Sequence, residues 1–121
     1  MPRMISVFCD TSVPLRAMLN AIEETLQITF SMREIEGIGV VFESAYDGAV
    51  IAAFEDHGLE DDSGIEFTRY SIEIDFSGGQ SEVDLLESGS KVAKRISEQF
   101  RCTTIVVNNL QQLKATYHCP V

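Results

Sequence analysis

Hydrophobic residues recur along this chain at two spacings, and each spacing predicts a different kind of element. In two segments they lie three or four positions apart, which places them on one face of an amphipathic helix. The spacing predicts one helix over about 13–26 and a second over about 82–100, which opens on Ser81 and Asp84 in the pattern of an N-terminal cap. The apolar residues of the first helix are Leu15, Met18, Leu19, Ile22 and Leu26.

Strands are predicted where apolar residues form short runs or alternate with polar ones. The runs at 5–9 and 102–108 are bounded by polar residues, and the second is rich in β-branched residues, which is typical of a central strand. Alternation at 113–117 predicts a last strand. Alternation at 28–33 fits either a strand or a continuation of the preceding helix.

The clearest local signal is that of a β-hairpin. Two apolar segments, 40–46 and 49–54, are joined by Asp47-Gly48, and this dipeptide favours a two-residue turn whose twist matches that of paired strands. Residues 55–64 are polar, acidic and interrupted by glycine. A hairpin followed by an acidic loop is therefore predicted.

The next segment, 65–76, is predicted to be one long strand with an irregularity. Ile65 and Phe67 share one parity, whereas the apolar residues after position 69 follow the other. A β-bulge near Thr68 would restore a common apolar face. The residues then left facing solvent or a partner are Ser71, Glu73 and Asp75.

Together these elements predict a single α+β domain over 1–121, with a mainly antiparallel sheet of five to seven strands and two helices packed on one face. The other face is left largely to water or a partner. A chain of 121 residues buries an ordinary single core, and no apolar run approaches the roughly 18–20 residues of a membrane span. Because Cys9, Cys102 and Cys119 show no C-x-x-C spacing, we expect buried, reduced thiols in a cytoplasmic protein.

Charge is distributed very unevenly along the chain. Residues 34–87 hold fifteen of the nineteen carboxylates and a single basic residue, Arg69, so this stretch carries a net charge of −14 in a chain of net charge −10. Charge of one sign concentrated in a small domain attracts partners of the opposite sign. Nucleic acid is disfavoured as a direct ligand, because proteins bind phosphates through Lys and Arg. The expected partner is a basic protein.

Patterns of catalytic or metal-binding residues are weak. Nucleophilic catalysis needs a base such as histidine, and the chain offers His57 in the acidic loop, where a solvated side chain is expected, and His118 near a strand end. A zinc site needs about four ligands in close pairs, and His118-Cys119 is the only adjacent pair. The acids around Asp61 lack the register of an EF-hand loop. No catalytic residue, cofactor or metal site is predicted.

Two resemblances to known families supply functional hypotheses. In size, charge and α+β plan, the chain resembles the small acidic immunity proteins encoded beside bacterial toxins, including those of contact-dependent inhibition systems. This resemblance implies a non-enzymatic inhibitor of a cognate toxin, commonly a cationic nuclease. The segment Phe8-Cys9-Asp10-Thr11-Ser12 resembles the strand end of PIN-type metal-dependent ribonucleases, in which the aspartate that matches Asp10 helps to hold a divalent ion. That second resemblance implies a parallel sheet, and the other interpretation of Asp10 is a turn or cap residue.

The partner-binding surface is predicted around the acidic loop and the hairpin turn. Carboxylates supply long-range attraction, whereas aromatic and apolar side chains supply most of the affinity at a desolvated centre. The predicted residues are the carboxylates Asp47, Glu55, Asp56, Glu60, Asp61, Asp62 and Glu66 and the anchors Tyr46, Leu59 and Tyr70. The alternatives are acids that only keep the protein in solution, and a structural homodimer.

Overall fold

The computed structural model describes residues 3–10 and 13–118, so Thr11, Ser12 and Cys119 of the patterns above lie outside the described residues. The helices are α1 (Leu15–Leu26) and α2 (Glu82–Phe100), and one turn of 3-10 helix, η1, covers Phe67–Arg69. The strands are β1 (Met4–Asp10), β2 (Ser31–Ile35), β3 (Gly39–Tyr46), β4 (Ala49–Glu55), β5 (Ile72–Ser77), β6 (Thr103–Asn108) and β7 (Gln112–Tyr117).

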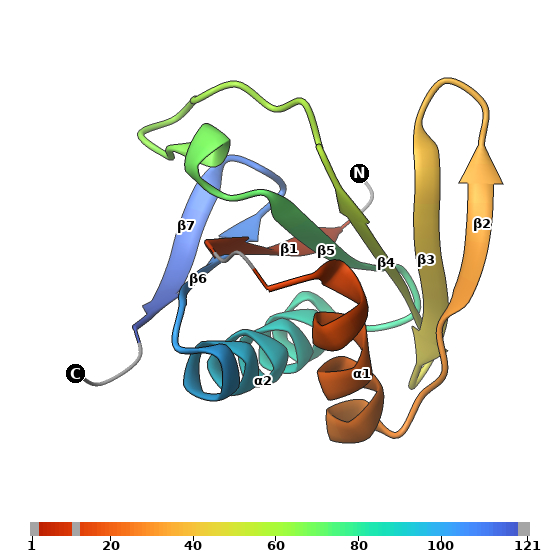
Figure 1. Cartoon of the computed structure of the whole chain (residues 1–121). Helices are drawn as coiled ribbons and strands as arrows, with labels where there is room; N and C mark the ends of the chain where they lie inside the picture. The colour runs from red at the N-terminus through yellow and green to blue at the C-terminus, as the bar shows by residue number, and fades with distance from the viewer. Residues whose placement is uncertain (1–2, 11–12, 119–121) are drawn as a thin grey trace.

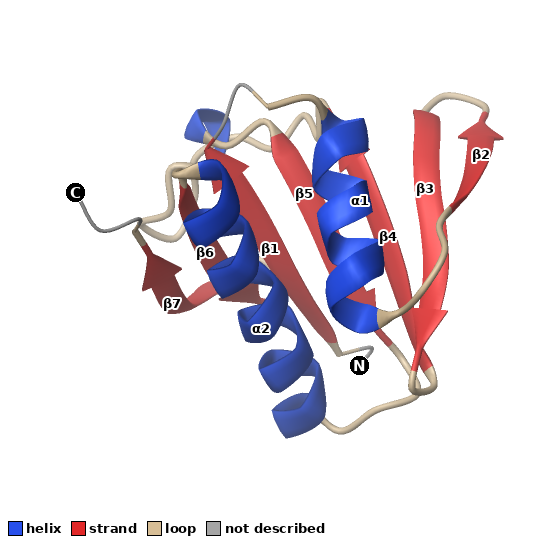
Figure 2. Cartoon of the chain, turned by 60° about the horizontal axis from the view of Figure 1, so that its bottom comes forward, coloured by secondary structure: helices blue, strands red, loops and turns tan. Residues whose placement is uncertain are grey.

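The seven strands form one antiparallel sheet in the order β2-β3-β4-β5-β1-β6-β7. Both helices pack on the same face of this sheet, with α1 over β4 and α2 over β1 and β6 (Figures 1 and 2). The predicted α+β fold is therefore confirmed, including the two helices on one face. The face covered by the helices is called the helix face below, and the opposite one the outer face.

Local signals set the ends of several elements. The side chain of Ser81 accepts a hydrogen bond from Asp84 N at 3.2 Å, and Glu82 and Asp84 lie in the first turn of α2, where the helix dipole favours negative charge. Asp47 and Gly48 adopt φ values of 49° and 86°, the left-handed pair that a type I′ hairpin turn requires. The cap and the hairpin turn are both where the sequence predicts them.

The main core fills the space between the helices and the helix face. It includes Ile5, Val7, Ile74 and Phe76 from the central strands and is closed by apolar residues of both helices. Gly89 lets α2 approach β1 closely, because a Cβ at this position would lie 2.8 Å from Ile5 Cγ2. Cys9 and Cys102 are buried thiols, and burial, followed by the nearby Cys102, raises the pKa of Cys9. No helix among the described residues is long and apolar enough to cross a membrane.

The prediction of one bulged strand over 65–76 is wrong. β5 begins only at Ile72, and residues 56–71 form a loop that crosses the outer face, called the crossing loop below (Figure 1). Its apolar residues pack on outward-facing residues of β1 and β6 in a second cluster. That cluster comprises Phe8, Ile65, Phe67, Tyr70, Ile105 and Val107, with Leu59 and Leu110 at its margin. Ile65 and Phe67 alternate because they cover a sheet, not because they belong to one.

The outer face is consequently not open along β5, and the predicted exposure of Glu73 and Asp75 is also corrected. Glu73 is only 4% exposed, and Asp75 is half-buried. The hydroxyl of Ser6 on β1 donates to Asp75 Oδ1 at 2.6 Å. Burial, a hydrogen bond with Asp75 and the charge of Asp75 raise the pKa of Glu73 to about 9. The pair therefore retains a proton at neutral pH, which lets it remain buried.

Candidate functional site

The crossing loop is organised around His57. The ring Nε2 donates to the carbonyl oxygen of Tyr70 at 2.6 Å, and Nδ1 accepts from Leu59 N at 2.9 Å. The ring also meets Phe8 edge-on, with 5.5 Å between centroids. His57 is thus half-buried and joins the two ends of the loop, in place of the solvated side chain that the sequence predicts.

Two aspartates fix the outer part of the same loop. Asp61 Oδ1 accepts from Thr68 N at 3.0 Å and from Thr68 Oγ1 at 2.8 Å, and these hydrogen bonds lower the pKa of Asp61. The backbone of Asp62 pairs with that of Ile65 through two hydrogen bonds, of 3.1 and 2.8 Å. These bonds hold the backbone of this part of the loop and fix the carboxylate of Asp61.

A groove of about 670 Å³ runs between the crossing loop and the turn that joins β6 to β7. Three carboxylates, Glu60, Asp61 and Asp62, form its outer wall, and apolar side chains from the second cluster form its base. This acidic groove is lined by Gly58, Leu59, Glu60, Asp61, Asp62, Phe67, Asn109, Leu110 and Gln111. Charge at the rim and apolar surface beneath it are the two elements of a protein-binding site.

The opposite wall of the acidic groove is a strained turn. Asn109 and Leu110 have φ values of 51° and 59°, and Gln111 N donates to Asn108 O at 3.0 Å. Asn109 tolerates this left-handed conformation, and its backbone and side chain both bond to Met4. For a leucine the same conformation costs about 1 kcal/mol, yet it places Leu110 against the second cluster. Nothing in the sequence pattern indicates this role of Leu110.

The structure separates the predicted partner-binding residues into several places. Leu59, Glu60, Asp61 and Asp62 meet in the acidic groove. Tyr46 and Asp47 precede β4 and so lie at the opposite end of that strand from the crossing loop. The other four predicted residues line two further grooves, Glu55 and Asp56 beside the β2–β3 hairpin and Glu66 and Tyr70 beside β7.

Tyr70 is a cluster residue more than an exposed anchor. Its side chain is 7% exposed, belongs to the second cluster, and lies under the guanidinium of Arg69 with 5.9 Å to the ring centroid. Burial raises the pKa of Tyr70. Its side chain therefore holds neighbouring residues of the crossing loop in place.

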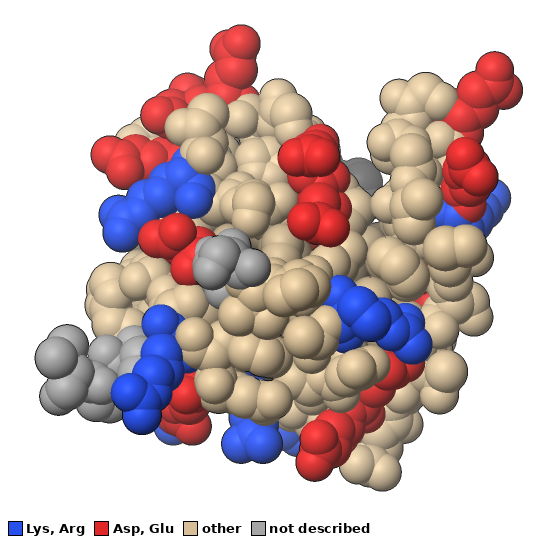
Figure 3. Space-filling view, viewed as in Figure 1, with Lys and Arg blue, Asp and Glu red and all other residues tan. Residues whose placement is uncertain are grey.

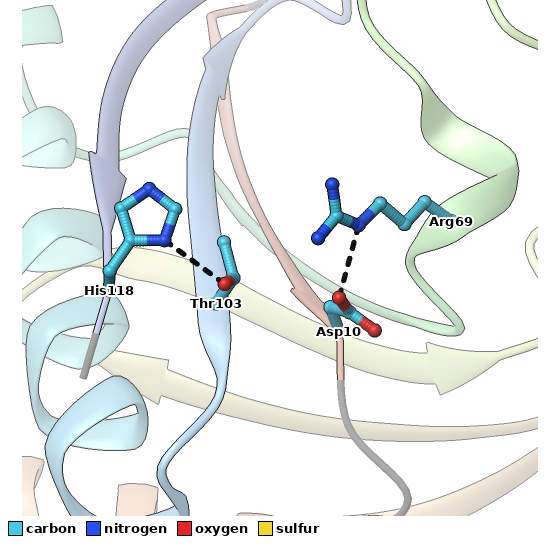
Figure 4. A network of polar contacts seen from close by, with 4 residues as sticks. All are labelled: Asp10, Arg69, Thr103 and His118. Atoms are coloured by element: carbon cyan, nitrogen blue, oxygen red, sulfur yellow. Dashed lines mark hydrogen bonds and ion pairs between the residues drawn. The ribbon is translucent and has the colours of Figure 1, made fainter. Parts of the chain in front are cut away.

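Arg69, the only base of the acidic stretch, is already engaged (Figure 4). Its Nε donates to Asp10 Oδ2 at 3.1 Å, and this bond raises the pKa of Arg69. Next to this pair, Thr103 Oγ1 lies 3.2 Å from His118 Nδ1. Asp10 thus bonds to a neighbouring loop at the strand end. The resemblance to PIN-type ribonucleases implies a parallel sheet, and this sheet is antiparallel throughout, so that resemblance does not extend to the fold.

Among the described residues, no carboxylate of the crossing loop forms an ion pair with a base. Within 3–10 and 13–118, the two ion pairs are Arg33–Glu43 and Arg69–Asp10, and neither includes an acid of this loop. Figure 3 shows carboxylates gathered over the loop and over the tip of the β2–β3 hairpin, with most of the Lys and Arg in that view lying lower. The loop therefore presents an excess of negative charge to solvent.

No protein-family model matches the chain, and no curated protein matches it either.

Proposed function

We propose that this chain is a non-enzymatic inhibitor of the immunity-protein type, which neutralises a basic bacterial toxin domain, a nuclease, in the cytoplasm. One observation carries the proposal: the acidic groove combines unpaired carboxylates, held by backbone hydrogen bonds, with an apolar base. A solubilising surface needs neither fixed carboxylates nor an apolar groove beneath them. A nuclease must present Lys and Arg to bind phosphate, and these are the groups such a groove attracts.

The groove geometry suits long basic side chains. Lys and Arg carry three or four methylene groups below the charged head, and these groups pack on apolar surface while the head stays at the rim. Here Leu59 and Leu110 offer that surface, and Glu60 and Asp62 offer acceptors above it. A charge-assisted hydrogen bond contributes about twice as much as a neutral one. A partner bound in this way would lose the basic residues that it needs for nucleic acid.

The proposal is tested with the product of the neighbouring reading frame. If that frame encodes a large protein ending in a basic domain, this domain and the present chain should form a stoichiometric complex, and complex formation should abolish the toxic activity of the domain. The charge-reversed pair Glu60→Lys and Asp62→Lys should protect poorly, whereas Glu98→Lys on the exposed side of α2 should protect like the unaltered chain. Full protection by the charge-reversed pair would contradict the proposal.

Leu110→Gly should weaken this complex while leaving the free protein about as stable as before. Glycine relieves the left-handed strain at this turn but removes the side chain at the base of the groove. We expect about a tenfold rise in the dissociation constant by calorimetry, the loss of roughly 1.4 kcal/mol of apolar contact. Val83→Ala, which truncates an exposed valine of α2, is the control and should change neither quantity. Unchanged affinity in Leu110→Gly would place the contact elsewhere.

A further inference from the structure

The two helices do not cover the whole helix face of the sheet. Neighbouring strands lie about 4.8 Å apart and packed helices about 10 Å apart, so each helix covers about two strands of a sheet. Two helices on a sheet of seven strands therefore leave part of the helix face bare. Figure 2 shows that this part is β2 and β3, which extend beyond α1 without a helix above them.

The bare part of the helix face is apolar. Strand pairing aligns Phe42 with Ala53 of the main core, so Phe42 points to the helix face. Met32 pairs with Phe42 and is 69% exposed, and Val40, two residues before Phe42, is 46% exposed. Ile38 at the hairpin tip is 69% exposed. Of the six large exposed apolar side chains in the part of the chain that the structure describes, three thus gather on one hairpin. A patch of this kind marks an interaction site.

A groove of about 300 Å³ continues this patch towards α1. Leu15 of α1 faces Ile38, Val40 and Phe42 of the hairpin across it, and Glu55 and Asp56 stand at its end. On β2, Glu34 pairs with Val40 and shares the helix face. The other charged side chain of β2, Arg33, has the opposite orientation and is bound to Glu43 at 3.3 Å. Apolar residues are therefore flanked by carboxylates on both sides of the patch.

We propose that this surface docks an amphipathic helix of a partner protein, which lies beside α1 as the third helix of the layer with its apolar side on Met32, Val40 and Phe42. Carboxylates on both flanks call for Lys or Arg along the edges of that helix. A second copy of this chain does not fit, because α1 and α2 bury their apolar faces in their own core and the copy carries the same negative charge. This surface is separate from the acidic groove, and the proposal does not depend on binding at that groove.

The test uses a synthetic 18-residue helix with leucines at alternating spacings of three and four and lysines elsewhere, titrated into isotopically labelled protein. NMR shift changes should centre on β2 and β3. The double variant Met32→Ser/Val40→Ser should bind at least tenfold more weakly with an unchanged melting temperature. Val83→Ser, which removes an exposed valine from α2, should bind like the unaltered chain. A matched peptide with glutamate for lysine should not bind.

Three results would overturn the inference. The first is unchanged binding in the double variant together with loss of binding in Glu60→Lys/Asp62→Lys, which would place the peptide in the acidic groove. The second is equal binding of the lysine and glutamate peptides, since the flanking carboxylates would then select nothing. The third is a concentration-dependent dimer of the unaltered chain in sedimentation that Met32→Ser/Val40→Ser does not form. The surface would then be occupied by a second copy of this chain.

Discussion

Replacing Glu73 by glutamine should make the protein more stable at pH 8 and flatten the pH dependence of its folding between about pH 4.5 and pH 9. The pKa of Glu73 is raised from 4.5 to about 9, first by burial, then by the hydrogen bond and charge of Asp75. The folded protein therefore keeps a proton that the unfolded chain releases above pH 4.5. The stability associated with this proton is fully present below pH 4.5 and is lost as the pH rises towards 9.

The size of this effect follows from linkage. Each pH unit in that window lowers the free energy of unfolding by up to about 1.4 kcal/mol for one retained proton. Glutamine keeps a donor for Asp75 without a proton to lose, so Glu73→Gln should raise the free energy of unfolding at pH 8 by on the order of 1–3 kcal/mol. Urea unfolding at pH 5, 6, 7 and 8 measures this directly. Glu66→Gln, at an exposed position of the crossing loop, is the control.

The surroundings of Glu73 also favour the protonated form of its carboxyl group. On the outer face it lies between Phe8 of β1 and Phe54 of β4, which offer no polar atom, and Asp75 is already bonded to Ser6. Burial raises the pKa of Asp75 as well, against the hydrogen bonds with Glu73 and Ser6, which lower it. If the slopes of Glu73→Gln and the unaltered protein coincided from pH 5 to pH 8, the carboxyl pair would not hold the proton we assign to it.

Gly79→Ala is expected to lower the free energy of unfolding by about 2–4 kcal/mol. Gly79 follows β5, has a φ of 63°, and lies so close to the β3–β4 turn that a Cβ would overlap the carbonyl oxygen of Gly48. The overlap is with backbone, which has no rotamer to change. Gln80 tightens the same contact, because its Nε2 donates to the carbonyl oxygens of Tyr46 and Asp47 at 3.2 Å each.

Gly78→Ala is the matched control for this prediction. Its φ of 67° is similar, but a Cβ there would meet no atom within 4 Å. Only the cost of a left-handed alanine remains, about 1 kcal/mol. Thermal and urea unfolding of both variants separates the steric contribution from the conformational one. Equal destabilisation of Gly78→Ala and Gly79→Ala would show that the turn yields to a methyl group.

Features that depend on neighbours in sequence were predictable here. The bounds of α2 and its cap at Ser81, and the hairpin turn at Asp47-Gly48, follow from residues within one or two turns of each other. The alternation at 28–33 fits a strand or a helix continuation, and the structure has a strand over Ser31–Ile35. It begins later because Phe30 completes the core and its N–H bonds to Glu23.

Features that depend on distant residues were not predictable. Ile65 and Phe67 have the spacing of a strand, yet a loop that must cover an apolar sheet face has the same requirement. Only the outward-facing Phe8 and Ile105, which this loop buries, decide between the two. The burial of Glu73 follows from that crossing. The acidic groove was not predictable either, because its two walls are about fifty residues apart in the sequence. Nor was the position of Asp47, which the length of β4 separates from the crossing loop.

The association rate constant with the cognate basic domain, measured against salt concentration, tests the central claim most directly. If fixed carboxylates at the acidic groove attract the partner, association should be fast, near 10⁸ M⁻¹s⁻¹ at low salt, and should fall steeply as salt is added. Glu60→Lys/Asp62→Lys should slow it roughly tenfold at low salt and flatten the salt dependence, while Glu98→Lys should leave the slope unchanged. A rate that neither salt nor reversal of Glu60 and Asp62 alters would contradict the assignment of this groove as the binding site.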